Sequence, residues 1–310
     1  MAKQQLAGRR IFRTAVDTAV HTAVHSALLF AFVLALVAAP LRAQTQSQSQ
    51  TDSKTPPLAG IAHIAIRVHS LEASRDFYKK LGFAEAFALS RNGAVYQSFF
   101  KINDHQFIEI YPANEKNTEI GFLHLCFEGV DLQAVYDDYI ARGVTPNFKI
   151  RKAGAGNLLF TMKGPMQVDQ PQNIEYTQYM PGSRHYNDRG KDLGADRVGT
   201  KLVIVTLAMQ DPDAARTFYL DKLKFTPDAR NPMLLHLPGD SGEMVDIVPV
   251  AKLGAKSSIF LASPDIRKSG ELLKAKGIDF TDGNTLTVTD PDGNIIHIMP
   301  ERGTRSGKMH

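Results

Sequence analysis

The chain lacks tryptophan and has a single cysteine, Cys126, among its 310 residues. One cysteine excludes an intramolecular disulfide, so buried apolar surface must stabilise the fold. An excess of positive charge is also missing outside the N-terminus. Five of the 36 Lys and Arg but only one of the 32 Asp and Glu lie in residues 1–43, so the rest of the chain is neutral. The composition therefore gives no reason to expect nucleic-acid binding.

Residues 1–43 have the pattern of an export signal. A basic stretch is followed by the apolar run "ALLFAFVLALVAAP" (27–40) and by small residues suited to cleavage after Ala43. The run is shorter than the roughly 20 residues that span a bilayer. We therefore predict an exported protein, periplasmic or secreted, that is free of the membrane after cleavage. An uncleaved membrane anchor is the alternative. The stretch "RRIF" (9–12) leaves export by the twin-arginine route open beside the general secretory route.

Composition changes divide the chain into segments. Gln and Ser dominate residues 44–59, and Gly, Pro, Asp and Asn crowd residues 179–199, which indicates a linker and a domain boundary. The prediction is a signal peptide (1–43), a flexible linker (44–59), a first domain (60–180), an interdomain linker (181–198), a second domain (199–300) and a tail (301–310).

A strand-then-helix pattern recurs four times, at residues 63–83, 124–144, 204–225 and 259–278. In the first copy, Ser70 is suited to cap a helix and Gly82 to end it. Strand-like runs follow each copy. The sequence therefore predicts an α+β fold of four βαβββ modules, paired into two domains.

Polar residues interrupt the apolar strands of the first two modules at matching positions. His63 and His124 lie on the first strands, and Glu109 and Glu175 lie on the last strands. Side chains alternate faces along a strand, so these four can converge on one face of a curved sheet. Burying two glutamates without a cation is costly, and two imidazoles with two carboxylates suit a divalent first-row metal. The alternative is that each residue is an independent, satisfied core polar group.

These residues resemble the vicinal oxygen chelate superfamily, which includes glyoxalase I, extradiol dioxygenases, methylmalonyl-CoA epimerase and fosfomycin-resistance enzymes. The resemblance covers residues 60–300, and the set His63, Glu109, His124 and Glu175 is similar to the glyoxalase I metal quartet. It implies one divalent metal ion (Zn, Ni, Fe, Mn or Co) that holds neighbouring substrate oxygens. It also implies that Glu175 or Glu109 is the catalytic base.

Further residues are candidates for substrate contact. Arg67 lies where glyoxalase I enzymes often have an arginine for a carboxylate, which suggests an anionic substrate; the alternative is a rim arginine paired to a surface acid. Departures at Ala113 and in "KGPMQVDQPQ" (163–172) argue against a glutathione hemithioacetal. The alternation of strand faces places several other side chains in the cavity, whereas the turn-like contexts of His105 and His185 suggest surface positions. The cavity candidates are Tyr111, Phe122, Cys126, Phe107 and Thr177, and inert packing is the alternative for Cys126.

The second domain has lost most of the corresponding polar residues. Alignment of the repeats places Ile204, Asp246, Ser258 and His297 at the four ligand positions. Two possible ligands are too few for a tight metal site, so a structural role is expected.

The resulting prediction is an exported metal-dependent enzyme with glyoxalase-like isomerase or lyase chemistry. It would act through a metal-stabilised enediolate on a small oxygen-chelating substrate, which can also carry a carboxylate. One alternative is an Fe(II) extradiol-type dioxygenase, against which the extra Glu109 argues. The other is a non-catalytic small-molecule binding protein of the bleomycin-resistance type. The expected state is a monomer acting as an internal pseudo-dimer, or a homodimer.

Overall fold

The computed structural model describes residues 55–301, so the predicted signal peptide and most of the predicted linker and tail lie outside the described residues. Strand β1 (Leu58–Val68) begins inside the segment that the sequence assigned to the linker. Leu58 is buried, and its N–H donates to Pro238 O at 2.8 Å, which explains the earlier start. Within the described residues, no helix is long and apolar enough to cross a membrane.

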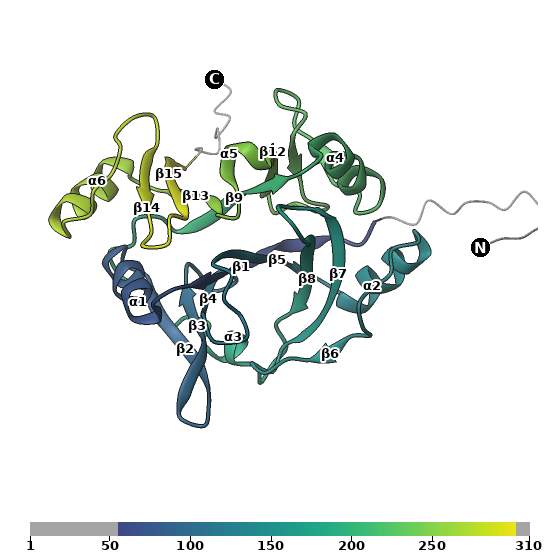
Figure 1. Cartoon of the computed structure of the whole chain (residues 1–310), viewed down its shortest axis with the longest axis horizontal. Helices are drawn as coiled ribbons and strands as arrows, with labels where there is room; N and C mark the ends of the chain where they lie inside the picture. Colours follow the sequence, from purple (N-terminus) through teal and green to yellow (C-terminus); the bar gives the residue numbers. More distant parts are fainter. Residues whose placement is uncertain (1–54, 302–310) are drawn as a thin grey trace, which may run out of the picture. The chain divides into compact units, whose positions relative to one another are not determined.

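The first two modules form one curved, eight-stranded sheet (Figure 1). Its strand order is β2-β3-β4-β1-β5-β8-β7-β6. The central strands β1 and β5 are antiparallel, β4 pairs parallel with β1, and β8 pairs parallel with β5, so the two modules repeat one plan. The strands after β1 are Ala84–Arg91 (β2), Ala94–Lys101 (β3), Phe107–Pro112 (β4), Gly121–Gly129 (β5), Arg151–Lys152 (β6), Leu158–Met166 (β7) and Pro171–Gln178 (β8).

The last two modules form a seven-stranded sheet in the order β10-β11-β12-β9-β13-β15-β14. The fourth module differs from the predicted plan, because a single bridge between Thr281 and Thr287 replaces one of its three later strands. The turn-forming stretch 282–284 (Asp-Gly-Asn) leaves little chain for a longer strand there. The strands of this sheet are Lys201–Met209 (β9), Thr226–Pro227 (β10), Leu234–His236 (β11), Met244–Pro249 (β12), Ser258–Ser263 (β13), Leu286–Thr289 (β14) and Ile295–Pro300 (β15).

One helix follows the first strand of each module, as predicted. Each begins after a residue whose side chain accepts a backbone N–H, and Ser70 has this role in the first module. The four helices are Leu71–Lys80 (α1), Leu132–Ala141 (α2), Pro212–Asp221 (α4) and Ile266–Ala275 (α6). Two single-turn helices, Arg184–Asn187 (α3) and Val250–Leu253 (α5), lie between modules.

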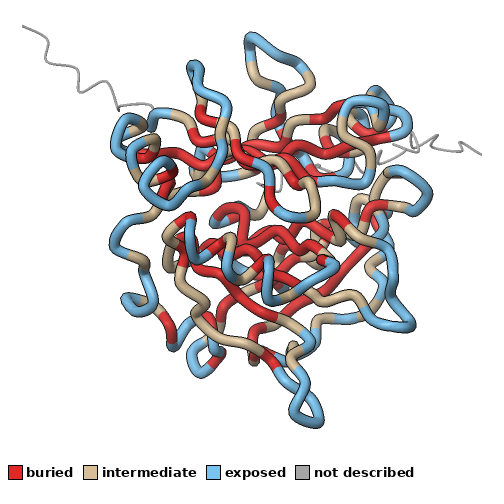
Figure 2. Tube along the Cα trace, turned by 60° about the vertical axis from the view of Figure 1, so that its left-hand side comes forward, coloured by how far each residue is buried: buried red, intermediate tan, exposed pale blue. Residues whose placement is uncertain are grey.

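Buried residues concentrate along the central strands of both sheets, and exposed residues in the turns and helices (Figure 2). On β1, Ile64, Ile66 and Val68 belong to the main core cluster. A second, smaller cluster includes Phe99, Phe107, Cys126 and Tyr179. The eight-stranded sheet is therefore covered by the main core on one face and has only a small apolar cluster beside its polar residues.

The two sheets belong to one compact unit and are joined by side-chain hydrogen bonds. Gln106, just before β4, donates to Leu202 O at 2.9 Å and accepts from Leu202 N at 2.7 Å. Tyr78 of α1 donates to Asp290 at 3.1 Å. These bonds fit the predicted structural role of the second half of the chain, while the separate domain limits at 180 and 199 stay a prediction.

Candidate metal centre

The four predicted ligands come from four adjacent strands of the eight-stranded sheet. Glu109 on β4 and His124 on β5 both lie opposite Ala65 of β1. His63 of β1 pairs with Cys126 of β5, which in turn lies opposite Glu175 of β8. Directly opposed residues share a face, so all four side chains start from the same side of the sheet.

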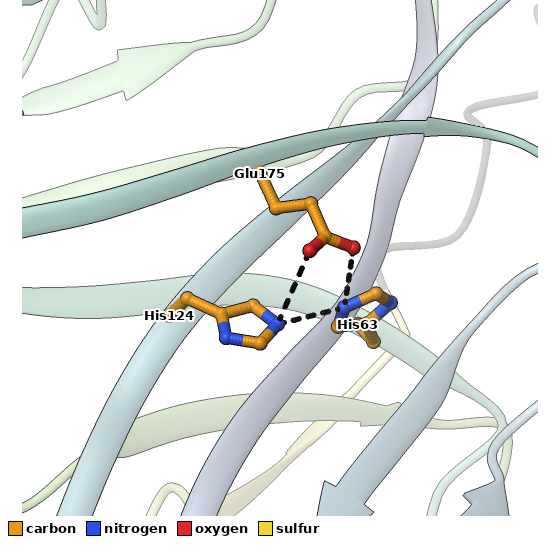
Figure 3. A group of neighbouring side chains, drawn as sticks. All are labelled: His63, His124 and Glu175. Atoms are coloured by element: carbon orange, nitrogen blue, oxygen red, sulfur yellow. Dashed lines mark hydrogen bonds and ion pairs between the residues drawn. The ribbon is translucent and has the colours of Figure 1, made fainter. Parts of the chain in front are cut away.

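Three of these side chains meet closely (Figure 3). The Nε2 atoms of His63 and His124 are 3.1 Å apart. Glu175 brings Oε1 to 3.5 Å from His63 Nε2 and Oε2 to 4.0 Å from His124 Nε2. One ligand atom from each of the three residues lies within 4.8 Å of the others.

Glu109 approaches the same histidines differently. Its Oε1 is 3.4 Å from Nδ1 of His63, the ring nitrogen that does not face His124, and its Oε2 is 4.0 Å from His124 Nε2. Gln97 Nε2 donates to Glu109 Oε2 at 2.7 Å, and the Tyr111 hydroxyl donates to the same oxygen at 3.1 Å. Glu109 is thus beside the three-residue group rather than within it, and its role as a fourth ligand stays a prediction.

Burial sets the charge state of this group. It lowers the pKa of His124 to about 4 and, together with the nearby His124 and His185, lowers the pKa of His63. Both imidazoles are therefore neutral at pH 7. Burial raises the pKa of Glu175 to about 7, and burial with repulsion from Glu175 raises the pKa of Glu109 well above its usual range.

The residues fit a divalent metal. Two nitrogens bound at about 2.1 Å to one metal lie roughly 3.0–3.4 Å apart for bond angles near 90–110°, and the two Nε2 atoms are 3.1 Å apart. Within residues 55–301, neither Glu109 nor Glu175 has an ion pair with Lys or Arg. A cation between two neutral imidazoles and a carboxylate would supply the missing positive charge.

A cavity of about 380 Å³ opens beside this group, and we call it the site cavity. Glu109, Glu175 and Tyr111 line it, as predicted for Tyr111. Cys126 is not part of its lining but donates to Glu175 Oε1 at 3.6 Å, so it does lie beside the site. The other lining residues are Gln97, Phe99, Phe148, Arg151, Ala153, Gly154, Ala155, Asn157, Leu159, Thr161, Asn173 and His185.

Two predicted substrate contacts do not line the site cavity. Phe122 packs against the main core, because the β1–β5 register shifts between the Ala65–His124 and Ile66–Phe122 pairs and breaks the alternation. Arg67 lies near the exposed Glu119, with 3.7 Å between guanidinium and carboxylate, and lines a different pocket.

The remaining predictions for this sheet divide into two groups. Phe107 lies in the small apolar cluster, and Thr177 donates to Leu158 O at 2.8 Å, so both are structural neighbours of the site rather than lining residues. His105 is exposed, as predicted. His185 is not a surface residue: it is 2% exposed and lines the site cavity.

Sequence reasoning missed several polar residues of the site cavity. Gln97 fixes Glu109, Asn173 lies opposite His124, and Arg151 lowers the pKa of Glu175 through its charge. The place of Asn173 two residues before Glu175 was the available signal, since residues two apart on a strand share a face. Gln97 and Arg151 come from outer strands whose position relative to the site is set by tertiary pairing.

The second sheet repeats the strand register of the first but not its group of possible metal ligands. Thr206 lies opposite both Asp246 and Ser258, as Ala65 does for Glu109 and His124, which supports the repeat alignment. His297 instead accepts or donates a hydrogen bond with Thr287 at 2.8 Å and stacks on Phe260. Among residues 55–301, the one group of three or more possible metal ligands is His63, His124 and Glu175.

Fold and site together define a protein of paired βαβββ modules with a potential metal centre in the first pair. Residues 60–169 match the model of the Glyoxalase/Bleomycin resistance protein/Dioxygenase superfamily. This match confirms the resemblance stated from the sequence for residues 60–169. No curated protein matched the chain.

Solved structures share the fold over both sheets. The 2,3-dioxygenase LapB from Pseudomonas sp. KL28 has 16% identity and a TM-score of 0.56, and the match covers 80% of this chain and 93% of that one. A Mn(II)-bound glyoxalase from Novosphingobium aromaticivorans has 15% identity and a TM-score of 0.58, over 78% and 82%. An extradiol ring-cleaving dioxygenase from B. fuscum has 16% identity and a TM-score of 0.57, over 81% and 74%. At these identities the likeness concerns the fold alone.

Proposed function

We propose that the protein is a divalent-metal-dependent enzyme with glyoxalase-like isomerase or lyase chemistry on a small substrate that offers two neighbouring oxygens. The observation that carries this proposal is the pairing of two neutral buried imidazoles with two buried carboxylates at the site cavity. Such a set is costly without a cation and has a place for a substrate beside it.

His63, His124 and Glu175 would hold the metal, in agreement with their mutual distances. When bound, a divalent metal polarises carbonyl oxygens and stabilises negative charge that develops on them. The neutral state of both imidazoles leaves their lone pairs available for this role. Zn, Ni, Fe, Mn and Co all remain candidates, since imidazole and carboxylate ligands accept each of them.

Glu109 is the better placed of the two carboxylates to move a proton. It lines the site cavity, lies beside the three-residue group, and has a raised pKa. A carboxylate of this kind can take a proton from a carbon next to a carbonyl and return it to the neighbouring carbon, which completes an isomerisation. Gln97 and Tyr111 would keep its Oε2 in place, leaving Oε1 for the transfer.

An Fe(II) extradiol-type dioxygenase is the second candidate. Two histidines and one carboxylate form the ligand set of non-haem Fe(II) oxygenases, and the close group here has this composition. The position of Glu109 outside that group weakens the sequence argument against oxygen chemistry. The buried carboxylate of Glu109 still has a clearer role in proton transfer than in oxygen chemistry. The isomerase or lyase proposal therefore comes first.

Metal content and two chemical readouts test these proposals. The purified protein would be analysed for metal before and after loading with each candidate ion, beside His63→Ala/His124→Ala and the matched exposed-histidine control His69→Ala/His105→Ala. We expect one metal per chain in the native protein and the control, and none in the site variant. Absence of metal from the native protein after every loading would overturn both candidates and favour a binding protein.

The chemistry is then decided with small model substrates. For an isomerase or lyase, we expect the metal-loaded protein to exchange carbon-bound hydrogen of hydroxyketones or 2-oxo acids with D₂O, followed by NMR. Glu109→Gln should retain metal and lose this exchange. Oxygen uptake with catechols that depends on Fe²⁺, without such exchange, would instead establish the dioxygenase candidate.

We also propose that the protein acts outside the cytoplasm, on the basis of the signal-like residues 1–43. Cell fractionation and N-terminal sequencing should find the protein in the exported fraction with Gln44 first. An intact Met1 in the cytoplasmic fraction would refute this localisation.

A further inference from the structure

His185 is held on a short helix at the site cavity. Helix α3 is fixed at its start, where Arg184 N donates to Ala155 O at 2.8 Å and the Arg184 guanidinium donates to Ala88 O at 2.9 Å. Ser183 caps the helix by accepting from Tyr186 N. These bonds connect α3 to strand β2 and to the turn before β7, so the position of the His185 backbone is defined.

Aromatic rings surround the His185 side chain. Tyr179 stacks on the imidazole with ring centroids 4.3 Å apart and an angle of 11°. Phe87, Phe99 and Phe107 meet it edge-on at 5.0, 5.2 and 4.9 Å. The ring is 2% exposed, and burial lowers the pKa of His185 to about 3, so it is a neutral imidazole with a fixed orientation.

Neither nitrogen of this ring has a hydrogen-bond partner among residues 55–301. A neutral imidazole has one N–H donor and one acceptor nitrogen, and buried polar atoms of this kind are nearly always paired. A phenylalanine would suit the aromatic surroundings without leaving unpaired nitrogens. Both nitrogens are covered by neighbouring atoms, and His185 lines the same cavity as Glu109 and Glu175, so a molecule that enters beside the ring and reaches a nitrogen can supply the missing partner.

We propose that His185 is a recognition subsite that binds an uncharged hydroxyl or carbonyl group of the substrate. This inference rests on the proposed metal centre, which would hold the other end of the same molecule. Phe99, Tyr111 and Phe148 also line the cavity and favour an apolar or aromatic body. The substrate class is therefore an aromatic or otherwise apolar compound with two neighbouring chelating oxygens and a further polar group remote from them.

A set of four metal-chelating probes tests this subsite. Benzohydroxamate offers the chelating oxygens alone, and 2-, 3- and 4-hydroxybenzohydroxamate add one hydroxyl at different positions. In the Zn²⁺-loaded protein, we expect at least one hydroxylated isomer to bind about five-fold tighter than benzohydroxamate, the ratio for one net hydrogen bond. His185→Phe should reduce that ratio to one, His185→Gln should restore part of it, and the exposed-histidine control His105→Phe should keep it.

A measurement on the native protein avoids dependence on how the variants fold. In ¹⁵N NMR of the Zn²⁺-loaded protein, the preferred hydroxylated isomer should shift the His185 ring nitrogens more than benzohydroxamate does. Equal affinities for all four probes, a preference that survives in His185→Phe, or unchanged His185 signals would overturn the subsite. Failure of every probe to bind, together with absence of bound metal, would instead refute the proposed metal centre.

Discussion

Replacing Glu175 with glutamine should have opposite effects on stability with and without metal. The Glu175 side chain is 12% exposed and lies within 4.0 Å of both imidazoles. Its pKa rises from the usual 4.5 to about 7 in the folded protein because of burial. The folded state therefore disfavours the ionised carboxylate, and a neutral amide of the same shape removes that penalty.

The magnitude follows from proton linkage. Each unit of pKa difference is worth about 1.4 kcal/mol, so the ionised Glu175 destabilises the metal-free fold by about 3 kcal/mol at pH 8. At pH 5 the folded carboxyl keeps its proton and the penalty falls to about 1 kcal/mol by the same relation. The penalty from Glu175 therefore grows as pH rises from 4.5 to 7. Above that window, metal-free Glu175→Gln should be more stable than the metal-free native protein.

Bound metal should reverse this order of stability between the native protein and Glu175→Gln. A ligand present at about 1,000 times its dissociation constant stabilises the fold by about 4 kcal/mol, and only the native carboxylate completes the three-residue ligand group. With metal at pH 8, the free energy of unfolding of the native protein should then exceed that of Glu175→Gln by about 1 kcal/mol, which is about 4 kcal/mol from metal binding less the penalty of about 3 kcal/mol.

Urea unfolding followed by far-UV circular dichroism measures both differences, with and without the metal identified for the native protein. Glu115→Gln is a matched control, since Glu115 is exposed. It should leave the free energy of unfolding unchanged in both conditions. If metal-free Glu175→Gln is no more stable than the native protein at pH 8, the argument that burial destabilises this carboxylate is refuted.

Three further predictions concern the metal and the fold. Below pH 7, metal must displace the Glu175 proton, so its dissociation constant should rise up to about ten-fold per pH unit; a pH-independent titration would contradict this. Asp246→Ala/His297→Ala should leave metal content unchanged by elemental analysis, because neither residue belongs to the ligand group. Gly82→Ala should lower the free energy of unfolding by about 1–3 kcal/mol, since its Cβ would clash with the backbone oxygen of Asp196. Gly93→Ala, whose Cβ would meet no neighbouring atom, should lower the free energy of unfolding by less in the same urea experiment.

The repeat is the part of the fold that the sequence alone could predict. Helix caps such as Ser70, the periodicity of apolar residues and the turn glycines act within a few residues, so each module carries its own local instructions. Matching polar positions on equivalent strands then indicated His63, His124 and Glu175 as one group. The structure also places Asp246 at the position equivalent to Glu109, because the paired strands of both sheets keep a common register.

Tertiary structure decided how the polar residues divide their roles. Glu109 faces Nδ1 of His63, because Gln97 from β3 and Tyr111 fix its other oxygen, and β3 reaches β4 only through sheet pairing. Arg67 has the expected strand face but turns toward Glu119 at the rim.

The remaining misses have the same origin. A register shift beside Ala65 takes Phe122 out of the alternation, which no count along the sequence can detect. His185 lies in a turn-rich segment that resembles a surface loop, yet aromatic rings from four separate segments bury it. Sequence thus determined the modules and the set of ligand candidates, because both follow from short-range periodicity. Only packing between distant segments determined which atoms of those residues face one another.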